Sequence, residues 1–309
     1  MTHSSPQTRR NLVVVRAGKN SLHQRWLNAG ANRSWDLVVS LYDPAAHFDH
    51  SEDVVTVVRP GGKWDGLHAF FADSDVLSRY DYVWLPDDDI DARSSNIDAI
   101  FEAMRRWRLD VAQPALTRDS YFTHFVVMAC PGFTLRYVNF VEIMVPCLSR
   151  DLLARMLEDF RDSMSGFGLD YVWCRQWDDN RRRAAILDEV TVRHTRPIGG
   201  VLRHLLTAGG RSADEEERLL CRRWGAKEKA RPLVYAAIDA DGRLREGRAR
   251  LGLTMAWRYL SVRGQFGAHV NLRAKTWQLL RRQLTRRVDL SRLARQAEAE
   301  AQTTAFEVE

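Results

Sequence analysis

Three consecutive carboxylates, Asp87, Asp88 and Asp89, follow directly after the apolar run YVWL and one proline. Aromatic and β-branched residues ahead of a proline predict a short buried strand that ends just before the acids. In α/β proteins, ligands bind beyond the carboxyl ends of such strands. Adjacent carboxylates repel one another unless water or a cation neutralises them, and a hard divalent ion with oxygen ligands is a natural neutraliser. The stretch therefore predicts a metal or substrate site, with a solvated acidic turn as the alternative.

Other residues with suitable chemistry lie at the ends of predicted elements or inside apolar runs. Glu142 stands within VEIMV, where burial would raise the pKa of its carboxyl towards the range useful for acid–base work. Asp170 falls in the first turn of a predicted short helix after GFG, and His194 ends a predicted strand. Each has a structural alternative: a buried partner of an arginine for Glu142, an acid favoured by the helix dipole for Asp170, and a surface histidine for His194.

Strands that alternate with helical stretches are predicted to position these residues. The apolar runs predict strands at 11–15, 35–42, 54–58, 82–85, 109–116 and 184–193, and helices near 21–27, 63–77, 94–108, 149–160 and 169–177. Two further strand-like runs, FVVMAC and YVNFVEIMV, flank Pro131 and Gly132 and predict a hairpin or two antiparallel additions. The alternation predicts a parallel sheet joined by right-handed crossovers.

Positive charge is concentrated in the last third of the chain. The 309 residues carry a formal net charge of +6, and residues 203–309 hold 22 Lys and Arg against 13 Asp and Glu. The first 202 residues hold 24 Lys and Arg against 27 Asp and Glu, so their formal charge is negative. The asymmetry predicts an anionic partner for the C-terminal third, such as a membrane surface, a phosphorylated lipid, an acidic glycan or nucleic acid.

The C-terminal third is expected to contain a small hairpin at 234–242 and basic helices at 254–297, in which Trp257 and Trp277 are interleaved among arginines. This combination favours peripheral contact with an anionic membrane. We do not expect nucleic acid as the partner, because no nucleic-acid-binding fold pattern is recognisable. The alternative is a pair of packed helices with a solvated basic face. We therefore divide the chain into an α/β domain at 1–200 and a basic, mainly helical region at 201–309.

Composition excludes several classes of protein. Apolar residues make up 45% and charged residues 28%, which is typical of a globular rather than a disordered chain. The four cysteines form no CxxC pair, which argues against zinc knuckles and redox dithiols. The first ten residues lack an apolar signal core, and no window reaches the length of a membrane-spanning helix. We expect a cytoplasmic protein that contacts a membrane only peripherally.

The order strand, helix, strand, strand, helix, strand, Asp-x-Asp resembles the GT-A class of nucleotide-sugar glycosyltransferases. In that class a lysine near the start of a helix precedes the acids, as Lys63 does in GGKWDGLHAFF. GFGLDYVW resembles the segment that places an acid at a helix start, and VRHTRP resembles the late histidine of the metal site. Residues 11–199 also resemble an uncharacterised bacterial and plant family of glycosyltransferase-like domains, through the DDD run, VEIMVP followed by SR, GFGLD and the terminal strand ending in histidine.

The resemblance implies a GT-A-like, Rossmann-like fold: a mostly parallel sheet flanked by helices, followed by a basic, mainly helical extension. It also implies metal-dependent transfer of a sugar from a nucleotide-sugar donor to a glycan or lipid-linked acceptor. Mn²⁺ or Mg²⁺ would bridge the diphosphate, and a nitrogen ligand suits Mn²⁺ better. The assigned residues are Asp87, Asp89 and His194 for the metal, Arg16, Lys63, Asp65 and Asp88 for the donor, and Asp170, then Glu142, for the general base.

In an inverting enzyme, attack by an acceptor hydroxyl needs a general base. We expect inverting transfer, although the sequence does not separate inverting from retaining transfer.

Two other classes of protein stay open. A phosphatase of the haloacid-dehalogenase type also has a strand followed by Asp-x-Asp, but its nucleophile strand lies near the start of the chain, whereas three predicted strands come first here. A non-catalytic membrane- or glycan-binding assembly protein would rely on the basic C-terminal third.

Overall fold

The computed structural model describes residues 9–27, 32–198, 212–228 and 231–296. Within these ranges the strands pair into one large sheet in the order β11-β10-β7-β9-β6-β8-β4-β1-β2-β3, and β5 pairs with β9. The strands are β1 (Asn11–Ala17), β2 (Trp35–Leu41), β3 (Val54–Val58), β4 (Tyr82–Trp84), β5 (Ile90–Asp91), β6 (Val111–Leu116), β7 (Phe133–Val138), β8 (Cys147–Ser149), β9 (Ala184–His194), β10 (Val234–Asp239) and β11 (Leu244–Glu246).

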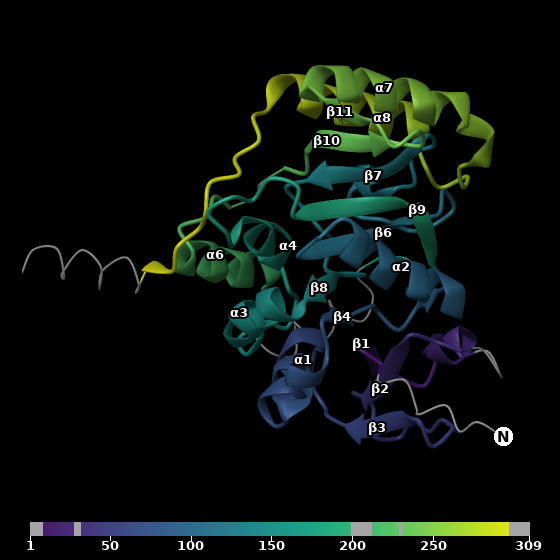
Figure 1. The fold of residues 1–309 in the computed structure, drawn as a ribbon, viewed down its shortest axis with the longest axis vertical. Helices are drawn as coiled ribbons and strands as arrows, with labels where there is room; N and C mark the ends of the chain where they lie inside the picture. The colour runs from purple at the N-terminus through teal and green to yellow at the C-terminus, as the bar shows by residue number, and fades with distance from the viewer. Residues whose placement is uncertain (1–8, 28–31, 199–211, 229–230, 297–309) are drawn as a thin grey trace, which may run out of the picture.

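Helices flank this sheet and cover one of its ends. The α-helices are α1 (Lys63–Ala72), α2 (Ser94–Arg106), α3 (Arg150–Phe160), α4 (Leu169–Val172), α6 (Ala213–Arg223), α7 (Arg248–Ser261) and α8 (Leu272–Thr285). Short 3₁₀ turns are η1 (His23–Trp26), η2 (Asp75–Arg79), η3 (Phe125–Val127), η4 (Trp173–Arg175) and η5 (Arg263–Gln265). Helix α2 packs on β6 and β9, and α3 packs on β4 and β8. Figure 1 shows α7 and α8 at the end of the sheet furthest from β3.

Strands β3, β2, β1 and β4 run parallel to one another, and all 7 residues of β1 are buried. A strand buried on both faces needs a continuous apolar run, which LVVV supplies in β1. Beyond β4 the pairs are antiparallel, except for β6 with β9. The predicted α/β fold with a central sheet flanked by helices is confirmed, as a mixed sheet whose parallel part lies mainly in the N-terminal half.

The predicted pair of strands around Pro131 is wrong in its first member and only partly right in its second, because β7 covers just the first two residues of YVNFVEIMV. FVVMAC begins with the 3₁₀ turn η3 and forms no hairpin strand, and β7 follows it. The buried guanidinium of Arg136 donates to the carbonyls of Val126 and Met128, at 2.7 and 2.8 Å. Because a side chain satisfies these carbonyls, the segment needs no partner strand for them. Strand β7 itself ends before Glu142, which therefore lies in a loop.

The region after residue 200 continues the sheet. Strands β10 and β11 form the predicted hairpin, and β10 pairs antiparallel with β7. Helix α7 lies on β10 and packs beside α8. The predicted boundary at residue 200 falls outside the described residues, and the division into two domains stays a prediction. Among the described residues, no helix combines the length and the apolar character needed to span a bilayer.

Candidate functional site

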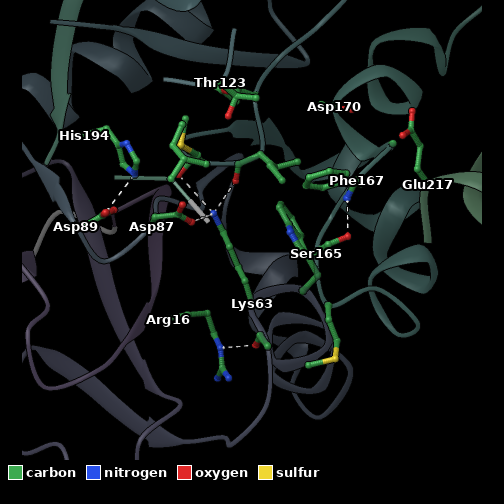
Figure 2. A pocket seen from close by; sticks show the side chains of 18 of the residues that line it. Arg16, Lys63, Asp87, Asp89, Thr123, Ser165, Phe167, Asp170, His194 and Glu217 are labelled. Atoms are coloured by element: carbon green, nitrogen blue, oxygen red, sulfur yellow. Dashed lines mark hydrogen bonds and ion pairs between the residues drawn. The ribbon is translucent and has the colours of Figure 1, made fainter. Parts of the chain in front are cut away.

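Residues at or after the ends of β1, β4, β7 and β9 line a cavity of about 690 Å³, part of which is seen in Figure 2. Every predicted site residue except Asp65 is in its wall. Asp65 lies in the first turn of α1, beside Gly61 and Gly62. The structure therefore brings together the predicted metal ligands, both candidate bases and most of the predicted donor-binding residues, but it does not bring Asp65 to the cavity.

Asp89 and His194 are brought together by the pairing of β5 with β9. Ile90 is aligned with His194 in this antiparallel pair, so Asp89 lies one residue before the contact. Nε2 of His194 is 3.1 Å from Oδ2 of Asp89, and Figure 2 shows the two side chains facing each other. Nδ1 of His194 donates to the Tyr121 carbonyl at 3.0 Å, which leaves Nε2 for the carboxylate or a metal ion.

Asp87 completes a cluster that fits a divalent cation. Ligand atoms of Asp87, Asp89 and His194 all lie within 4.8 Å of one another. Oδ1 of Asp89 is buried and has no hydrogen-bond partner among the described residues, which is costly unless a cation or water satisfies it. Burial lowers the pKa of His194, but Asp89 and Asp87 more than offset this and hold it above its usual value. Two carboxylates and an imidazole suit Mn²⁺ or Mg²⁺, and the nitrogen favours Mn²⁺.

Lys63 lies beside this cluster, at the first position of α1. Its Nζ donates to Oδ1 of Asp87 at 2.6 Å and to the carbonyl of Ile143 at 2.7 Å. Burial lowers the pKa of Lys63, and the negative charge of Asp87 opposes that shift. The ammonium therefore balances one carboxylate of the cluster and ties the acidic loop to the loop that follows β7.

Arg16, at the end of β1, is buried and stabilises the turn that precedes Lys63, the first residue of α1. It donates to the carbonyls of Gly61 and Gly62, both at 3.0 Å. Burial lowers the pKa of Arg16 to about 10. A Cβ at Gly66 would lie 2.3 Å from Cζ of Arg16, so α1 can approach this closely only because the position is glycine.

Asp88 has a different set of partners from its two neighbours. Its Oδ2 accepts from the backbone N–H of Gly18 at 3.0 Å and from the hydroxyl of Tyr42 at 3.3 Å, and its Oδ1 accepts from Arg196 at 3.0 Å. These contacts fix the acidic loop against the end of β1. Sequence reasoning missed Tyr42 and Arg196 as cavity residues, although both follow closely after strands, where ligand-binding residues are expected.

A second pair of acids lies elsewhere in the cavity wall. Among the described residues, neither oxygen of Glu142 has a hydrogen bond of normal geometry, nor does Oδ1 of Asp170. Burial raises the pKa of Glu142 to about 8, against a smaller lowering by His194 and Thr123. Burial also raises the pKa of Asp170 well above its usual value, and Glu142 adds to that shift. The charge of Glu142 therefore acts on Asp170, and burial favours the protonated form of both carboxyls.

The GFG turn shapes the approach to Asp170. Gly166 and Gly168 have φ angles of 76° and 93°, in the left-handed region that favours glycine. A Cβ at Gly166 would lie 2.1 Å from Nε1 of Trp64, so the turn packs directly on the residue that follows Lys63. Gly168 then caps α4, and Asp170 lies in the first turn of that helix, as predicted.

Residues 5–228 match the model of a family described as "Protein of unknown function (DUF707)". This chain belongs to the DUF707 family. The matched range contains the acid cluster, both candidate bases and almost all of the cavity wall. A comparison with curated proteins found no match.

Solved structures similar to this chain include S. aureus TarS, residues 1–349, with a TM-score of 0.40 and 9% identity over 60% of this chain and 60% of that one. The same TarS segment in complex with UDP-GlcNAc gives a TM-score of 0.43 and 9% identity over 89% of this chain and 71% of that one. The 4-diphosphocytidyl-2C-methyl-D-erythritol synthase of Anaerococcus prevotii gives a TM-score of 0.35 and 10% identity over 65% of this chain and 96% of that one. These similarities concern the fold alone.

Three further cavity residues come from the part of the chain after residue 200. Asp214 and Glu217 lie on α6, inside the range matched by the DUF707 model, and Arg231 lies just beyond it. Sequence reasoning missed all three, because charged residues on a polar helix, or in the loop before β10 in the case of Arg231, carry no signal that separates a cavity wall from a solvated face. The region predicted as an extension thus contributes side chains to the cavity.

Proposed function

We propose that this DUF707 protein is a metal-dependent glycosyltransferase that moves a sugar from a nucleotide-sugar donor to a glycan or lipid-linked acceptor. The observation that carries the proposal is the cluster of Asp87, Asp89 and His194 in the wall of a cavity of about 690 Å³. Ligand sites typically have volumes of roughly 300–1,000 Å³. The order of the Asp-x-Asp motif and the late histidine along the chain agrees with the GT-A resemblance.

The reaction breaks the bond between the sugar and a nucleoside diphosphate, so negative charge collects on the departing diphosphate. Asp87, Asp89 and His194 would hold Mn²⁺ or Mg²⁺, which when bound supplies positive charge to the diphosphate oxygens. Lys63 adds a cationic group beside the cluster. Arg16 and Asp88 bond mainly within the protein, so their proposed contribution to donor binding is to position the surrounding loops.

Asp170 is our first choice for the general base that takes the proton of the acceptor hydroxyl, and Glu142 is the second. Such a base typically contributes about 10²–10⁴-fold to the rate. Burial raises the pKa of both carboxyls, which makes the ionised form of either a stronger proton acceptor than an exposed carboxylate. A base acting on the acceptor, with a metal on the leaving group, corresponds to a single displacement that inverts the anomeric centre.

The melting temperature of the protein with nucleoside diphosphates and nucleotide sugars, each with and without Mn²⁺, tests the proposal. We expect stabilisation only when a nucleotide and Mn²⁺ are both present, and we expect Asp89→Ala to abolish it. Asp91→Ala is the matched control, because Asp91 follows the cluster in sequence but does not line the cavity. Unchanged metal-dependent stabilisation in Asp89→Ala would overturn the assignment.

Product analysis separates this function from the two alternatives. Sugar transfer from the nucleotide sugar identified by the melting experiment supports a glycosyltransferase. Rapid hydrolysis of a generic aryl phosphate without sugar transfer would indicate a phosphatase instead. A protein that binds none of the nucleotides would be better described as a membrane- or glycan-binding factor.

A further inference from the structure

Helices α7 and α8 form a two-helix layer at the end of the molecule furthest from β3 (Figure 1). The helices are antiparallel: a Cβ at Gly252, near the start of α7, would lie 2.7 Å from Cβ of Gln283, near the end of α8. This close approach packs the helices tightly against each other. Their inner side is buried through Leu251, Met255, Tyr259 and Leu279.

The outer side of this layer carries five large apolar side chains that are exposed to solvent. They are Leu253, Trp257, Leu260, Trp277 and Leu284, with exposed fractions of 58%, 71%, 40%, 66% and 48%. Spacings of three, four and seven residues keep them on one side of each helix, opposite the buried residues. We call this surface the α7–α8 face. Single exposed apolar residues are common, but a group of them on adjacent helices marks an interaction surface.

The same segment is uniformly basic. Residues 247–288 contain ten Lys and Arg and no Asp or Glu. Six of the arginines are exposed: Arg250, Arg263, Arg273, Arg281, Arg286 and Arg287. Within the part of the chain that the structure describes, none of these six forms an ion pair. Their charge is therefore left for a partner outside the described fold.

We propose that the α7–α8 face docks on an anionic lipid bilayer. Helices that lie in a bilayer surface place Trp and Leu at the boundary of headgroups and acyl chains, and they place arginines against the lipid phosphates. A second copy of the same face is a poor partner, because a symmetric contact would set positive charge against positive charge. Nucleic acid would match the arginines but would leave the exposed leucines against a phosphate backbone.

Helix α8 also lies close to the candidate active site. Nζ of Lys275 is 5.5 Å from the ring centroid of Phe122, near His124 in the cavity wall. Burial, together with the nearby charges of Arg282, Arg231 and Lys275, lowers the pKa of His124 to about 4. Docking would therefore bring the cavity close to the bilayer, where a lipid-linked acceptor resides. This consequence rests on the proposed function, whereas the docking itself does not.

Co-sedimentation of the full chain with vesicles at low salt tests the docking. We expect binding to mixed phosphatidylglycerol–phosphatidylcholine vesicles and none to phosphatidylcholine alone. The triple variant Arg250→Gln/Arg273→Gln/Arg281→Gln should bind roughly five-fold more weakly per arginine removed. The double variant Trp257→Ala/Trp277→Ala should bind at least about ten-fold more weakly, because it removes the apolar part of the contact.

The matched control is Arg161→Gln/Arg181→Gln/Arg218→Gln, which removes the same charge from exposed positions outside the α7–α8 face. Its binding should stay close to that of the wild type, and all variants should keep the wild-type melting temperature. Docking at this face is overturned by no binding to the anionic vesicles, by an equal loss in the control, or by full binding in either α7–α8 variant. Capture of single-stranded DNA without vesicle binding would also overturn it. The assay needs no turnover, so its failure is distinct from failure of the proposed function.

Discussion

Asp89 and His194 face each other at 3.1 Å from opposite halves of the chain, and the Tyr121 carbonyl fixes the imidazole from its other side. We expect His194→Ala to weaken Mn²⁺ binding by at least about ten-fold, because even the loss of a residue that only orients a ligand costs about 10–100-fold. Titration calorimetry with Mn²⁺ alone measures the effect. His124→Ala is the matched control, since His124 lines the same cavity outside the cluster. Equal affinity in His194→Ala and wild type would contradict the ligand assignment.

Burial holds the pKa of Glu142 at about 8, above the 4.5 of an unburied glutamate. The native state therefore binds this proton more tightly than the unfolded chain does. That contribution to stability is complete below about pH 4.5 and is lost as the pH rises through about 8. We expect wild type to lose stability across this window, by an amount on the order of 3–5 kcal/mol, and Glu142→Gln to lose much less.

Chemical unfolding in chelator-containing buffers across that pH window measures the Glu142 contribution. Glu102→Gln is the control, because this residue is exposed on α2 and should leave the wild-type pH dependence unchanged. Parallel pH profiles for wild type and Glu142→Gln would show that Glu142 does not hold its proton in the folded state.

The kcat of the Asp170→Asn variant shows whether Asp170 or Glu142 is the general base. We expect Asp170→Asn to keep binding of the nucleotide and Mn²⁺, because the metal cluster does not include this residue. We expect kcat for sugar transfer to fall by about 10²–10⁴-fold, because the amide cannot accept the proton. Steady-state assays with the identified donor measure kcat and KM separately. Transfer at the wild-type rate would remove Asp170 as the base and leave Glu142 for the role.

The GFG turn depends on the glycine at position 166. In Gly166→Ala, the alanine would have to adopt a φ of 76° and would meet Nε1 of Trp64 at 2.1 Å. We expect the free energy of unfolding to fall by about 2–4 kcal/mol, from backbone strain together with the clash. Gly264→Ala is the control, since no atom lies within 4 Å of a Cβ there. Urea unfolding compares the two variants, and equal stability would show that the turn can rearrange without cost.

The acidic cluster could be predicted because each of its parts has a local signal. The apolar run before Asp87 ends in a proline, and His194 ends a long strand that reads clearly from its sequence. The meeting of Asp89 with His194 could not be predicted in the same way. It depends on the pairing of β5 with β9, and β5 has only 2 residues, which are too few to form a pattern.

Arg136 shows why the segment FVVMAC is wrongly predicted as a strand. Arginine is rarely buried, yet this side chain has an exposed fraction of 0% because Asp188 compensates its charge. The guanidinium also donates hydrogen bonds to two backbone carbonyls of FVVMAC. This segment is predicted as a strand because it is apolar and contains β-branched residues. Nothing local in the sequence joins Arg136 to Asp188, so both the pair and its effect on the neighbouring segment required the folded structure.

The Arg136–Asp188 pair is itself open to test. Nε of Arg136 is 2.7 Å from Oδ2 of Asp188, and Nη1 is 3.2 Å from the hydroxyl of Tyr259 on α7. We expect Asp188→Asn to lower the free energy of unfolding by roughly 3–5 kcal/mol, because the guanidinium stays buried without its counter-charge. Glu158→Gln, which breaks an exposed pair with Arg161, should cost at most about 1 kcal/mol.

Urea unfolding followed by tryptophan fluorescence and by circular dichroism measures both costs and also reports on the C-terminal region. Because Arg136 connects β7 to Tyr259 of α7, the loss in Asp188→Asn should appear as one shifted transition with both probes. A second transition that keeps its wild-type midpoint would show that the region after residue 200 unfolds independently of the sheet. A cost no larger than that of Glu158→Gln would instead show that the buried pair contributes little to the stability of the fold.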